Sequence, residues 1–488
     1  MENKSENLLR AQLYEDEMIK KEILHRKPIF HFSAPIGWIN DPNGFSAYKG
    51  EYHLFYQYHP YANRWGPMHW GHAKSKDFVE WEVLPIALAP DQDYDNYGCF
   101  SGTALQDADK HIIAYTSVCE NEENGLNTIR QTQSIAIGDG INYVKQINNP
   151  IIGSDMIPYQ DSKEDFRDPK IWKQNDKYYI LVANRREDGN GQILKYSSIN
   201  LKDWIFEGVM FSSEEKIGNM WECPDYFKLD NKQILIISPQ DMMAKKLKYH
   251  SGNGSIYLVS KEDSNSFEPE NIDTIDFGID FYAPQTLETL DGRRIMIAWM
   301  QSWDVPSYPS DFEWCGMMTF PRELTLSDNN IIQNPAKEIE NYWENEIIYK
   351  DETVCGKNNF AGINGRSIDL TLRLRNLFCD VFEIQLAKHE DTYISIELDI
   401  RKGLLTFDRK YTQCIRDIVN ERKVEIDTKH NEASLRILLD LYSIEIFIDN
   451  GRKVLTSLFF INEEYDEIDF ISKNGSCIID IAKRDIME

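Results

Sequence analysis

The feature that most constrains the fold is a unit of about 60 residues that recurs five times within residues 27–335. Each copy has a polar head, a strand-like segment, a tight turn and a returning apolar strand. The copies begin at Asp41, Ser101, Arg167, Glu222 and Ala283. A period of this length has room for four strands and their loops, and repeated β units are typical of propellers. The sequence therefore predicts an all-β chain whose main domain, residues 27–335, is a five-bladed β-propeller.

Three of the five copies carry an acid close to a proline: Asp41 in WINDPNG, Asp168 in FRDPK and Glu222 in WECPD. Because Pro42 has no backbone N–H to donate, Asp41 is expected at a strand edge or a turn. Taken alone, Asp41 is equally compatible with an Asx-turn that caps its own backbone. The first strand of each propeller blade lines the channel, so the three acids are expected to converge at one end of the axis. A β-sandwich is the rival fold, but it gives no reason for these motifs to fall in phase.

The flanking segments differ from the repeats. Residues 1–26 are predicted to be a short helical segment, since residues 6–25 lack Gly and Pro and carry a loose apolar stripe at Leu9, Leu13, Ile19 and Ile23. We expect this helix to pack on the main domain. Residues 336–350 are polar and acidic and are interpreted as a linker. Residues 351–488 alternate apolar and polar positions with period two, which predicts a C-terminal β-sandwich. A stabilising role is favoured for this domain over carbohydrate binding.

The charge balance excludes several classes of partner. The formal net charge is −27, which repels nucleic acid and anionic membrane surfaces. No run of about 18 apolar residues occurs, and the first 27 residues have no signal-like apolar segment. The eight cysteines form no Cys-x-x-Cys pair, so free thiols in a reducing compartment are expected. A cytoplasmic protein that binds neither nucleic acid nor membrane is the resulting expectation.

Three carboxylates around one concave mouth indicate acid–base chemistry. Crowding like charges raises at least one pKa, which leaves a proton donor beside an ionised partner. Glycoside hydrolysis needs such a pair. Aromatic residues near the acids suit stacking on sugar rings: Trp38, Trp65, Trp70, Phe100, Trp299, Trp303 and Trp314. Polar side chains suited to hydroxyl recognition are Asn40, Gln57, Ser101 and Arg167. A small-molecule sugar is therefore the expected partner.

Metal and cofactor sites are not indicated. His53, His59, His69 and His72 cluster in the sequence, but no His-x-x-x-His pair or cysteine-rich spacing accompanies them, so structural roles are favoured. The sequence has no Gly-rich phosphate loop, dinucleotide fingerprint or Gly-x-Ser-x-Gly elbow. We therefore expect no metal, no cofactor and no serine-hydrolase chemistry.

The ordered set of motifs resembles glycoside hydrolase family 32. The motifs are WINDPNG at 38–44, GPMHWGHAKSKD at 66–77, CFSGTA at 99–104, FRDPK at 166–170, WECPD at 221–225, APQT at 283–286 and GMMTFPREL at 316–324. The resemblance spans roughly residues 27–488. Within the family, the chain is most similar to bacterial intracellular sucrose-6-phosphate hydrolases and β-fructofuranosidases (invertases). The resemblance implies a five-bladed propeller followed by a β-sandwich.

The resemblance also implies a retaining mechanism with two working carboxyl groups about 5–5.5 Å apart. Asp41 would be the nucleophile that forms a fructosyl-enzyme ester, and Glu222 the general acid and then the base. Asp168 would hold fructose hydroxyls and stabilise the transition state. The substrate-binding residues would be Trp38, Asn40, Gln57, Trp65, Phe100, Ser101, Arg167 and Trp299. The adjacent Arg167 is further expected to keep Asp168 ionised.

The expected reaction is hydrolysis of terminal non-reducing β-D-fructofuranosides. Sucrose, sucrose 6-phosphate and short fructooligosaccharides remain alternative substrates, and the motifs leave the oligomeric state open. A fructosyltransferase would use the same intermediate with a sugar as acceptor. A non-catalytic sugar-binding propeller is a further alternative, although a binding module needs no acid–base pair.

Overall fold

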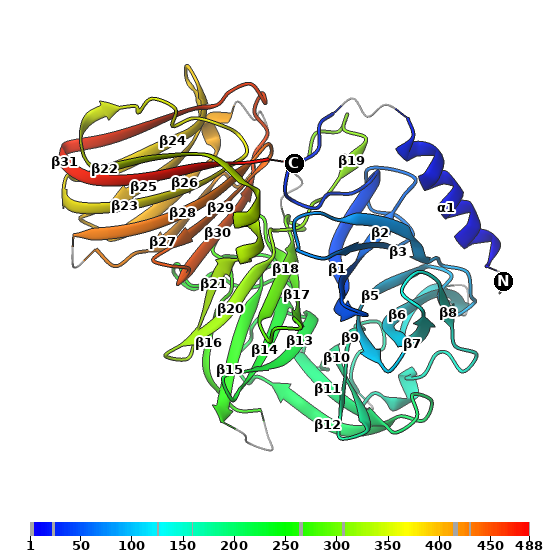
Figure 1. The fold of residues 1–488 in the computed structure, drawn as a ribbon. Coiled ribbons are helices and arrows are strands. Elements are labelled where there is room, and N and C mark those ends of the chain that lie inside the picture. Colours follow the sequence, from blue (N-terminus) through cyan, green and yellow to red (C-terminus); the bar gives the residue numbers. More distant parts are fainter. Residues whose placement is uncertain are drawn as a thin grey trace.

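The computed structural model describes residues 4–21, 25–123, 126–158, 160–262, 267–304, 308–412, 418–428 and 431–487. Figure 1 shows a ring of small sheets beside a separate stack of long strands, with one helix on the outside of the ring. The ring is a five-bladed β-propeller and the stack is a C-terminal β-sandwich, so the predicted fold class is confirmed. Among the described residues, no helix is long and apolar enough to cross a membrane.

The first two blades follow directly in sequence, each as an antiparallel meander. Blade 1 consists of β1 (Gly37–Tyr48), β2 (Glu51–His59), β3 (His69–Ser75) and β4 (Glu82–Leu88). Blade 2 consists of β5 (Gly98–Asp107), β6 (Lys110–Glu123), β7 (Leu126–Gly138) and β8 (Tyr143–Lys145). A short 3₁₀ turn, η1 (Ser154–Met156), leads to the next blade.

The remaining three blades repeat the same meander. Blade 3 consists of β9 (Phe166–Gln174), β10 (Lys177–Arg185), β11 (Gly191–Ser198) and β12 (Ile205–Ser212). Blade 4 consists of β13 (Trp221–Leu229), β14 (Lys232–Pro239), β15 (Ile256–Glu262) and β16 (Pro269–Thr274). Blade 5 consists of β17 (Tyr282–Glu288), β18 (Arg294–Trp299), β20 (Arg322–Ser327) and β21 (Asn330–Pro335).

The first strand of every blade lies at the axis. β1, β5, β9, β13 and β17 contact one another in that order, and β17 contacts β1 to complete the circle. Each of the five predicted copies begins in one of these strands. Tight turns follow them because Asn and Asp tolerate positive φ: Asn175 and Asp176 have φ of 50° and 58° between β9 and β10.

The ring is closed by a short parallel pairing next to the first acid motif. β19 (Trp314–Cys315) pairs with Gly37 and Trp38 of β1. The Met318 N–H donates to the Phe32 carbonyl at 2.8 Å, which extends the contact. Gly316 has a φ of 102°, and a Cβ there would lie 2.2 Å from the Ile39 carbonyl oxygen. Only glycine fits this closure.

The N-terminal helix α1 (Glu6–Ile19) is shorter than predicted, and a different face of it packs on the propeller. Its N-cap is Ser5, whose Oγ accepts from the Leu8 N–H at 3.2 Å. Leu8, Ala11 and Glu15 are buried against the propeller, whereas the predicted stripe residues Leu9, Leu13 and Ile19 are exposed. The apolar stripe predicted the wrong buried face because the face that is buried includes a carboxylate, Glu15. Residues 22–24, which include the last predicted stripe residue, lie outside the described residues.

The sandwich begins earlier than predicted. After η2 (Lys337–Tyr342), strand β22 (Trp343–Asn358) starts inside the stretch interpreted as the linker 336–350. Most β22 side chains are exposed or half-buried. One face of this edge strand packs on the sandwich core through Ile347, Tyr349 and Val354, but three register shifts interrupt the alternation, so the sequence has the look of a polar linker.

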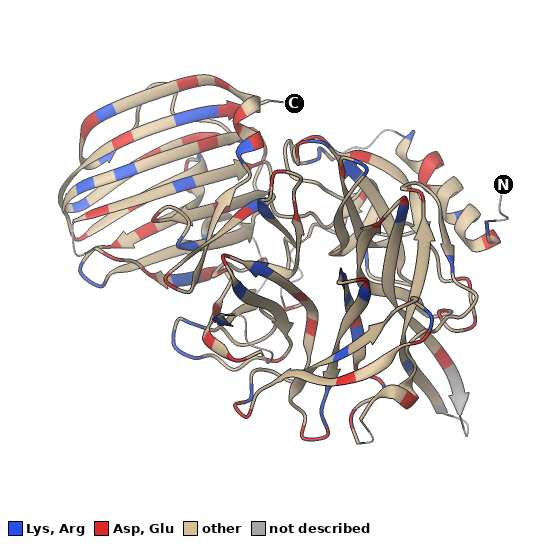
Figure 2. Ribbon diagram, turned by 60° about the horizontal axis from the view of Figure 1, so that its bottom comes forward, with Lys and Arg blue, Asp and Glu red and all other residues tan. Residues whose placement is uncertain are grey.

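The other sandwich elements follow in sequence order: β23 (Ile368–Phe378), β24 (Val381–His389), β25 (Thr392–Asp399), β26 (Leu404–Asp408), η3 (Lys410–Thr412), β27 (Glu421–Glu425), β28 (Glu432–Asp440), β29 (Ser443–Ile448), β30 (Lys453–Leu458) and β31 (Glu467–Ile486). β31 pairs with β24 in its first part and with β23 in its second, so one long strand belongs to both layers. Acidic and basic positions are scattered along these strands (Figure 2), as expected for solvated faces.

The two domains share a buried interface. Phe30 and Phe320 of the propeller belong to one apolar cluster with Leu438 and Phe447 of the sandwich. A buried polar network crosses the same interface. His31 Nδ1 lies 2.8 Å from Asp440, and its Nε2 lies 2.9 Å from Glu445. Arg322 ion-pairs with Asp276 and Glu445. A shared core with paired charges holds the domains in one arrangement.

Candidate active site

The three predicted acids line one cavity of about 350 Å³ at one end of the propeller axis. Asp41 comes from β1, Asp168 from β9 and Glu222 from β13. The residues that line the cavity are Asn40, Asp41, Gln57, Trp65, Phe100, Ser101, Gln131, Arg167, Asp168, Glu222, Gln240 and Trp303. The predicted convergence of the acids is present in the structure.

A β-bulge in each inner strand aims these side chains inward. The strand registers shift between Ile39 and Pro42 in β1, opposite Asp168 in β9, and between Glu222 and Asp225 in β13. A proline cannot donate to the ladder, so each Pro-containing motif interrupts the pairing at the same height. Asp168 and Cys223 have φ of 65° and 49°. The bulges thus convert a sequence motif into a ring of inward-facing groups.

Asp41 has one carboxylate oxygen that accepts a hydrogen bond and one that does not. Its Oδ2 accepts from the Ser101 Oγ at 2.6 Å and lies 3.5 Å from the Cys223 Sγ. Its Oδ1 has no hydrogen-bond partner among the described residues. Burial and the charge of Glu222 raise the pKa of Asp41 to about 6, although the hydrogen bond from Ser101 acts in the opposite direction. Asp41 is therefore mostly ionised at pH 7.

Asp168 is held by backbone contacts. Its Oδ2 accepts from the Cys223 N–H at 2.9 Å, and its own N–H donates to the Thr116 Oγ1 at 2.8 Å. Burial and the charge of Glu222 raise the pKa of Asp168 to about 7. Arg167 lowers this pKa but is outweighed. Arg167 thus favours the ionised form of Asp168, as predicted, but desolvation and a nearby carboxylate exceed the effect of this cation.

Glu222 receives the hydrogen bond from Arg167 instead. Arg167 Nε donates to Glu222 Oε1 at 2.9 Å, and the Tyr282 hydroxyl donates to Glu222 Oε2 at 2.6 Å. Arg167 is itself fixed by Asp165, which accepts from its NH1 at 2.8 Å. The cavity thus holds two strongly desolvated acids and a third acid with both oxygens bound.

Both parts of the chain match models of one family. Residues 31–335 match the family model described as "Glycosyl hydrolases family 32 N-terminal domain", and residues 338–484 match "Glycosyl hydrolases family 32 C terminal". The chain belongs to glycosyl hydrolase family 32. It is therefore a glycoside hydrolase by family, and the recognition from its motifs is confirmed.

Individual relatives of this family 32 chain agree with the domain matches. It is 34% identical over 480 residues to a sucrose-6-phosphate hydrolase of Zymomonas mobilis, covering 94% of this chain and 91% of the relative. A β-fructofuranosidase of Bombyx mori has a TM-score of 0.85 at 31% identity, covering 98% of this chain and 99% of that chain. The structure of a sucrose-6-phosphate hydrolase from Lactobacillus gasseri has a TM-score of 0.83 at 28% identity, covering 99% and 97%.

Six of the eight predicted substrate-binding residues line the cavity of this family 32 chain: Asn40, Gln57, Trp65, Phe100, Ser101 and Arg167. Trp65 and Trp303 stand at its mouth, with 40% and 39% of their surface exposed. These two indoles are the accessible aromatic faces of the site.

The other two predicted residues lie behind the cavity wall. Trp299 is fully buried in a small cluster with Tyr282, so it is not available to a substrate. Trp38 stacks on Trp303 at 6.2 Å and donates from Nε1 to Asn40 Oδ1 at 2.9 Å. Trp70 and Trp314, also considered as sugar platforms, are buried core residues. Trp70, Trp299 and Trp314 are buried because aromatic residues near an acid in sequence also fill the core between blades. Trp38 is half-buried beside Trp303, and its role in substrate binding stays a prediction.

Several site residues were missed. Gln131 lies on β7 and Gln240 follows β14, and neither position carries a recognisable motif. Tyr282 and Cys223 touch the acids from within or beside the APQT and WECPD motifs. Their proximity to these motifs was the available signal.

The histidine cluster packs within blade 1 and does not line the cavity. His53 Nδ1 lies 2.9 Å from His72 Nε2, and burial holds the pKa of His72 well below its usual range. Within the described part of the chain, no group of three or more His, Cys, Asp or Glu side chains is arranged to hold a metal ion.

Proposed function

We propose that this family 32 chain hydrolyses terminal non-reducing β-D-fructofuranosides, with sucrose and sucrose 6-phosphate as its main substrates, through a covalent fructosyl-enzyme intermediate. The observation that carries the proposal is the convergence of Asp41, Asp168 and Glu222 on one cavity. The printed names of the relatives, sucrose-6-phosphate hydrolase and β-fructofuranosidase, support the same substrate class.

Asp41 is the proposed nucleophile. Ser101 fixes one carboxylate oxygen, and the other is buried with no hydrogen-bond partner among the described residues. In the first step, Asp41 Oδ1 forms a bond to the anomeric carbon of fructose as the bond between this carbon and the leaving oxygen breaks. The pKa of about 6 leaves Asp41 ionised for this attack at neutral pH.

Glu222 is the proposed proton carrier. It gives its proton to the leaving oxygen in the first step, and in the second step it takes a proton from the water that attacks the fructosyl ester. Free fructose leaves and Asp41 is regenerated. Arg167 and Tyr282 hold the Glu222 carboxyl group in place for both transfers.

Asp168 is proposed to bind fructose hydroxyls and to stabilise positive charge on the ring in the transition state. Its carboxyl group is fixed by the Cys223 N–H. The proposed fructose contacts come from Asn40, Gln57, Trp65, Phe100, Ser101 and Arg167. Trp38 is proposed to support Trp303 and Asn40 from behind.

The test is a set of kcat/KM values for sucrose, sucrose 6-phosphate, raffinose and inulin, with product analysis at high sucrose. The proposal expects sucrose to release fructose and glucose in equal amounts. In the presence of methanol, it expects methyl β-D-fructofuranoside, in which the configuration at the anomeric carbon is retained. Longer oligosaccharides as the main product would assign the chain to fructosyl transfer. No release of fructose from any of these sugars would leave a sugar-binding propeller.

A further inference from the structure

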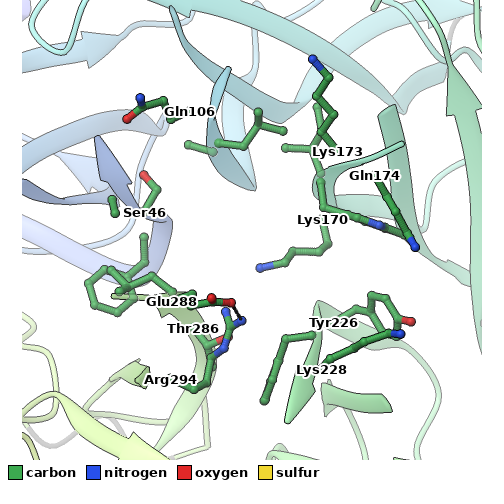
Figure 3. A pocket seen from close by; sticks show the side chains of 18 residues that line it. Ser46, Gln106, Lys170, Lys173, Gln174, Tyr226, Lys228, Thr286, Glu288 and Arg294 are labelled. Atoms are coloured by element: carbon green, nitrogen blue, oxygen red, sulfur yellow. Dashed lines mark hydrogen bonds and ion pairs between the residues drawn. The ribbon is translucent and has the colours of Figure 1, made fainter. Parts of the chain in front are cut away.

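A second cavity, of about 520 Å³, opens at the opposite end of the propeller axis. The acids of the first cavity come from the beginnings of the inner strands, whereas this cavity is lined by their ends. Figure 3 shows side chains from all sides of the ring around the opening. The residues from the ends of the inner strands include Ser46, Gln106, Lys170, Lys228 and Glu288, and β18 adds Arg294.

The two ends of the axis have opposite charge. The second cavity is lined by four cations, Lys170, Lys173, Lys228 and Arg294, and by one acid, Glu288. The first cavity is lined by three acids and one cation. A basic opening is unexpected by composition in a chain with a net charge of −27. We name the second cavity, lined by these four cations, the basic mouth.

Lys170 and Lys173 each have an acid partner within the propeller. Lys170 forms an ion pair with Asp225, which is fully buried. Lys173 Nζ lies 2.8 Å from Asp107 Oδ1 on the neighbouring inner strand β5. The buried Asp225 holds the Lys170 ammonium group in place. The pair of Lys173 with Asp107 is half-exposed and is therefore weaker.

Arg294 of the basic mouth lies close to two acids, Glu288 and the fully buried Asp225. Its NH2 lies 3.0 Å from Glu288, but that carboxylate is 66% exposed, so the pair is weakened by solvent. The Arg294 Nε is buried and has no hydrogen-bond partner among the described residues, and the same holds for the Thr286 Oγ1 in the same wall. The guanidinium group lies 4.9 Å from the centre of the Phe227 ring.

We propose that the basic mouth binds a phosphoryl group, either as inorganic phosphate or as the phosphate monoester of a small polyol. A phosphate presents several acceptor oxygens to the planar guanidinium of Arg294 and to the ammonium groups of Lys170 and Lys228. Figure 3 shows Lys170 and Arg294 projecting toward the same opening. The carbon chain of an ester lies along the apolar walls, where Trp172 and Leu287 line the cavity. This site uses none of the acids at the other end, so it does not depend on the proposed hydrolysis.

The test is calorimetric titration of the full chain at low salt with inorganic phosphate, with glycerol 3-phosphate and with glycerol as the neutral control. Phosphate and glycerol 3-phosphate are expected to bind, and glycerol is not. A tighter Kd for the ester assigns the site to phosphate monoesters, and equal Kd values assign it to free phosphate. Arg294→Gln is expected to raise Kd about tenfold, which corresponds to ~1.4 kcal/mol. Lys228→Gln, at an exposed position, is expected to raise it about threefold without affecting the fold.

Two control variants separate this site from others. Lys177→Gln removes the same charge from a lysine that pairs with Glu207 outside the basic mouth, and it is expected to leave Kd unchanged. Arg167→Gln removes the cation of the first cavity and is also expected to leave Kd unchanged. The proposal is overturned if the wild type shows no binding, if neither Arg294→Gln nor Lys228→Gln weakens it, or if Arg167→Gln abolishes it.

Discussion

Arg167 Nε lies 2.9 Å from Glu222 Oε1, so the cation beside Asp168 in sequence serves the acid of the next blade. This relationship arises because β9 and β13 are neighbours at the axis and because both strands bulge at the same height. The guanidinium group also contacts Asp165 and Gln131. Arg167 therefore links two blades through the proposed proton carrier.

Replacing Arg167 by lysine is expected to lower kcat/KM for sucrose roughly 10- to 100-fold. An ammonium group cannot keep the hydrogen bonds to Glu222 and Asp165 together. The matched control is Arg185→Lys, since Arg185 also pairs with Asp165 but from a half-exposed position away from Glu222. Steady-state kinetics on both variants check the prediction, and equal effects of the two changes would contradict it.

Asp41→Asn is expected to abolish activity and to raise Tm at pH 7. The folded-state pKa of about 6 lies above the ordinary value of 3.8, so ionising Asp41 costs the folded state up to ~3 kcal/mol at neutral pH. This cost is complete above pH 6 and disappears below pH 3.8. The Tm difference between variant and wild type should therefore shrink as the pH falls from 7 to 4. A variant that is active, or that is less stable than wild type at pH 7, would refute the assignment.

Ser101→Ala is expected to shift the acid limb of kcat/KM to higher pH. The hydrogen bond from the Ser101 Oγ favours ionised Asp41, so its loss raises a pKa that already stands at about 6. A charge-assisted hydrogen bond of this kind corresponds to about one pH unit. The measurement is the pH profile of kcat/KM between pH 4 and 8. An unchanged limb would show that another group controls it.

Glu222→Gln is expected to reduce hydrolysis of sucrose far more than hydrolysis of an aryl fructoside. An aryloxide leaves without protonation, so the loss of the proton donor matters less in the first step. Sucrose turnover should fall by roughly 10³-fold or more. Rates for both substrates, together with a burst of aryloxide before the slow second step, distinguish this role from that of Asp41. A similar loss on both substrates, with no burst, would argue against Glu222 as the acid.

The domain interface is expected to weaken at alkaline pH. Burial lowers the pKa of His31, but hydrogen bonds to Asp440 and Glu445 outweigh it and raise the pKa to about 9. Protonated His31 stabilises the folded state by up to ~3 kcal/mol; this contribution is complete below pH 6.5 and is lost as the pH rises through 9. Wild type should therefore lose more Tm between pH 7 and 10 than His31→Gln. His389→Gln, at an exposed position, is the control and should follow wild type.

The propeller and its acids could be predicted because the motif that interrupts each inner strand is local in sequence. In β1, β9, β13 and β17 the motif carries a proline that cannot donate to the ladder, and the period of about 60 residues gives the number of blades. All five inner strands shift register at this height, including β5 near Ser101 and β17 near Ala283. The positions of the three acids at the axis therefore follow from local sequence motifs and their spacing.

The partners of these residues could not be predicted in the same way. Whether Arg167 serves Asp168 or Glu222, and whether Trp299 faces substrate or core, depends on how neighbouring blades pack. Gln131 and Gln240 enter from second and third strands whose sequences carry no motif. The polar edge strand β22 was misassigned because three register shifts interrupt its alternation of polar and apolar residues.

Because β1 pairs with β19, the strand that carries Asp41 is complete only when the whole ring has formed, and we expect activity to require the intact propeller. Asp41 lies on β1 three residues after Trp38, which pairs with Cys315 of β19. A growing chain contains Asp41, the proposed nucleophile, from the first blade, yet β1 gains its last neighbour, β19, only when the fifth blade is made. Truncation within any blade should thus yield an inert protein, with no fragment that retains weak or indiscriminate activity.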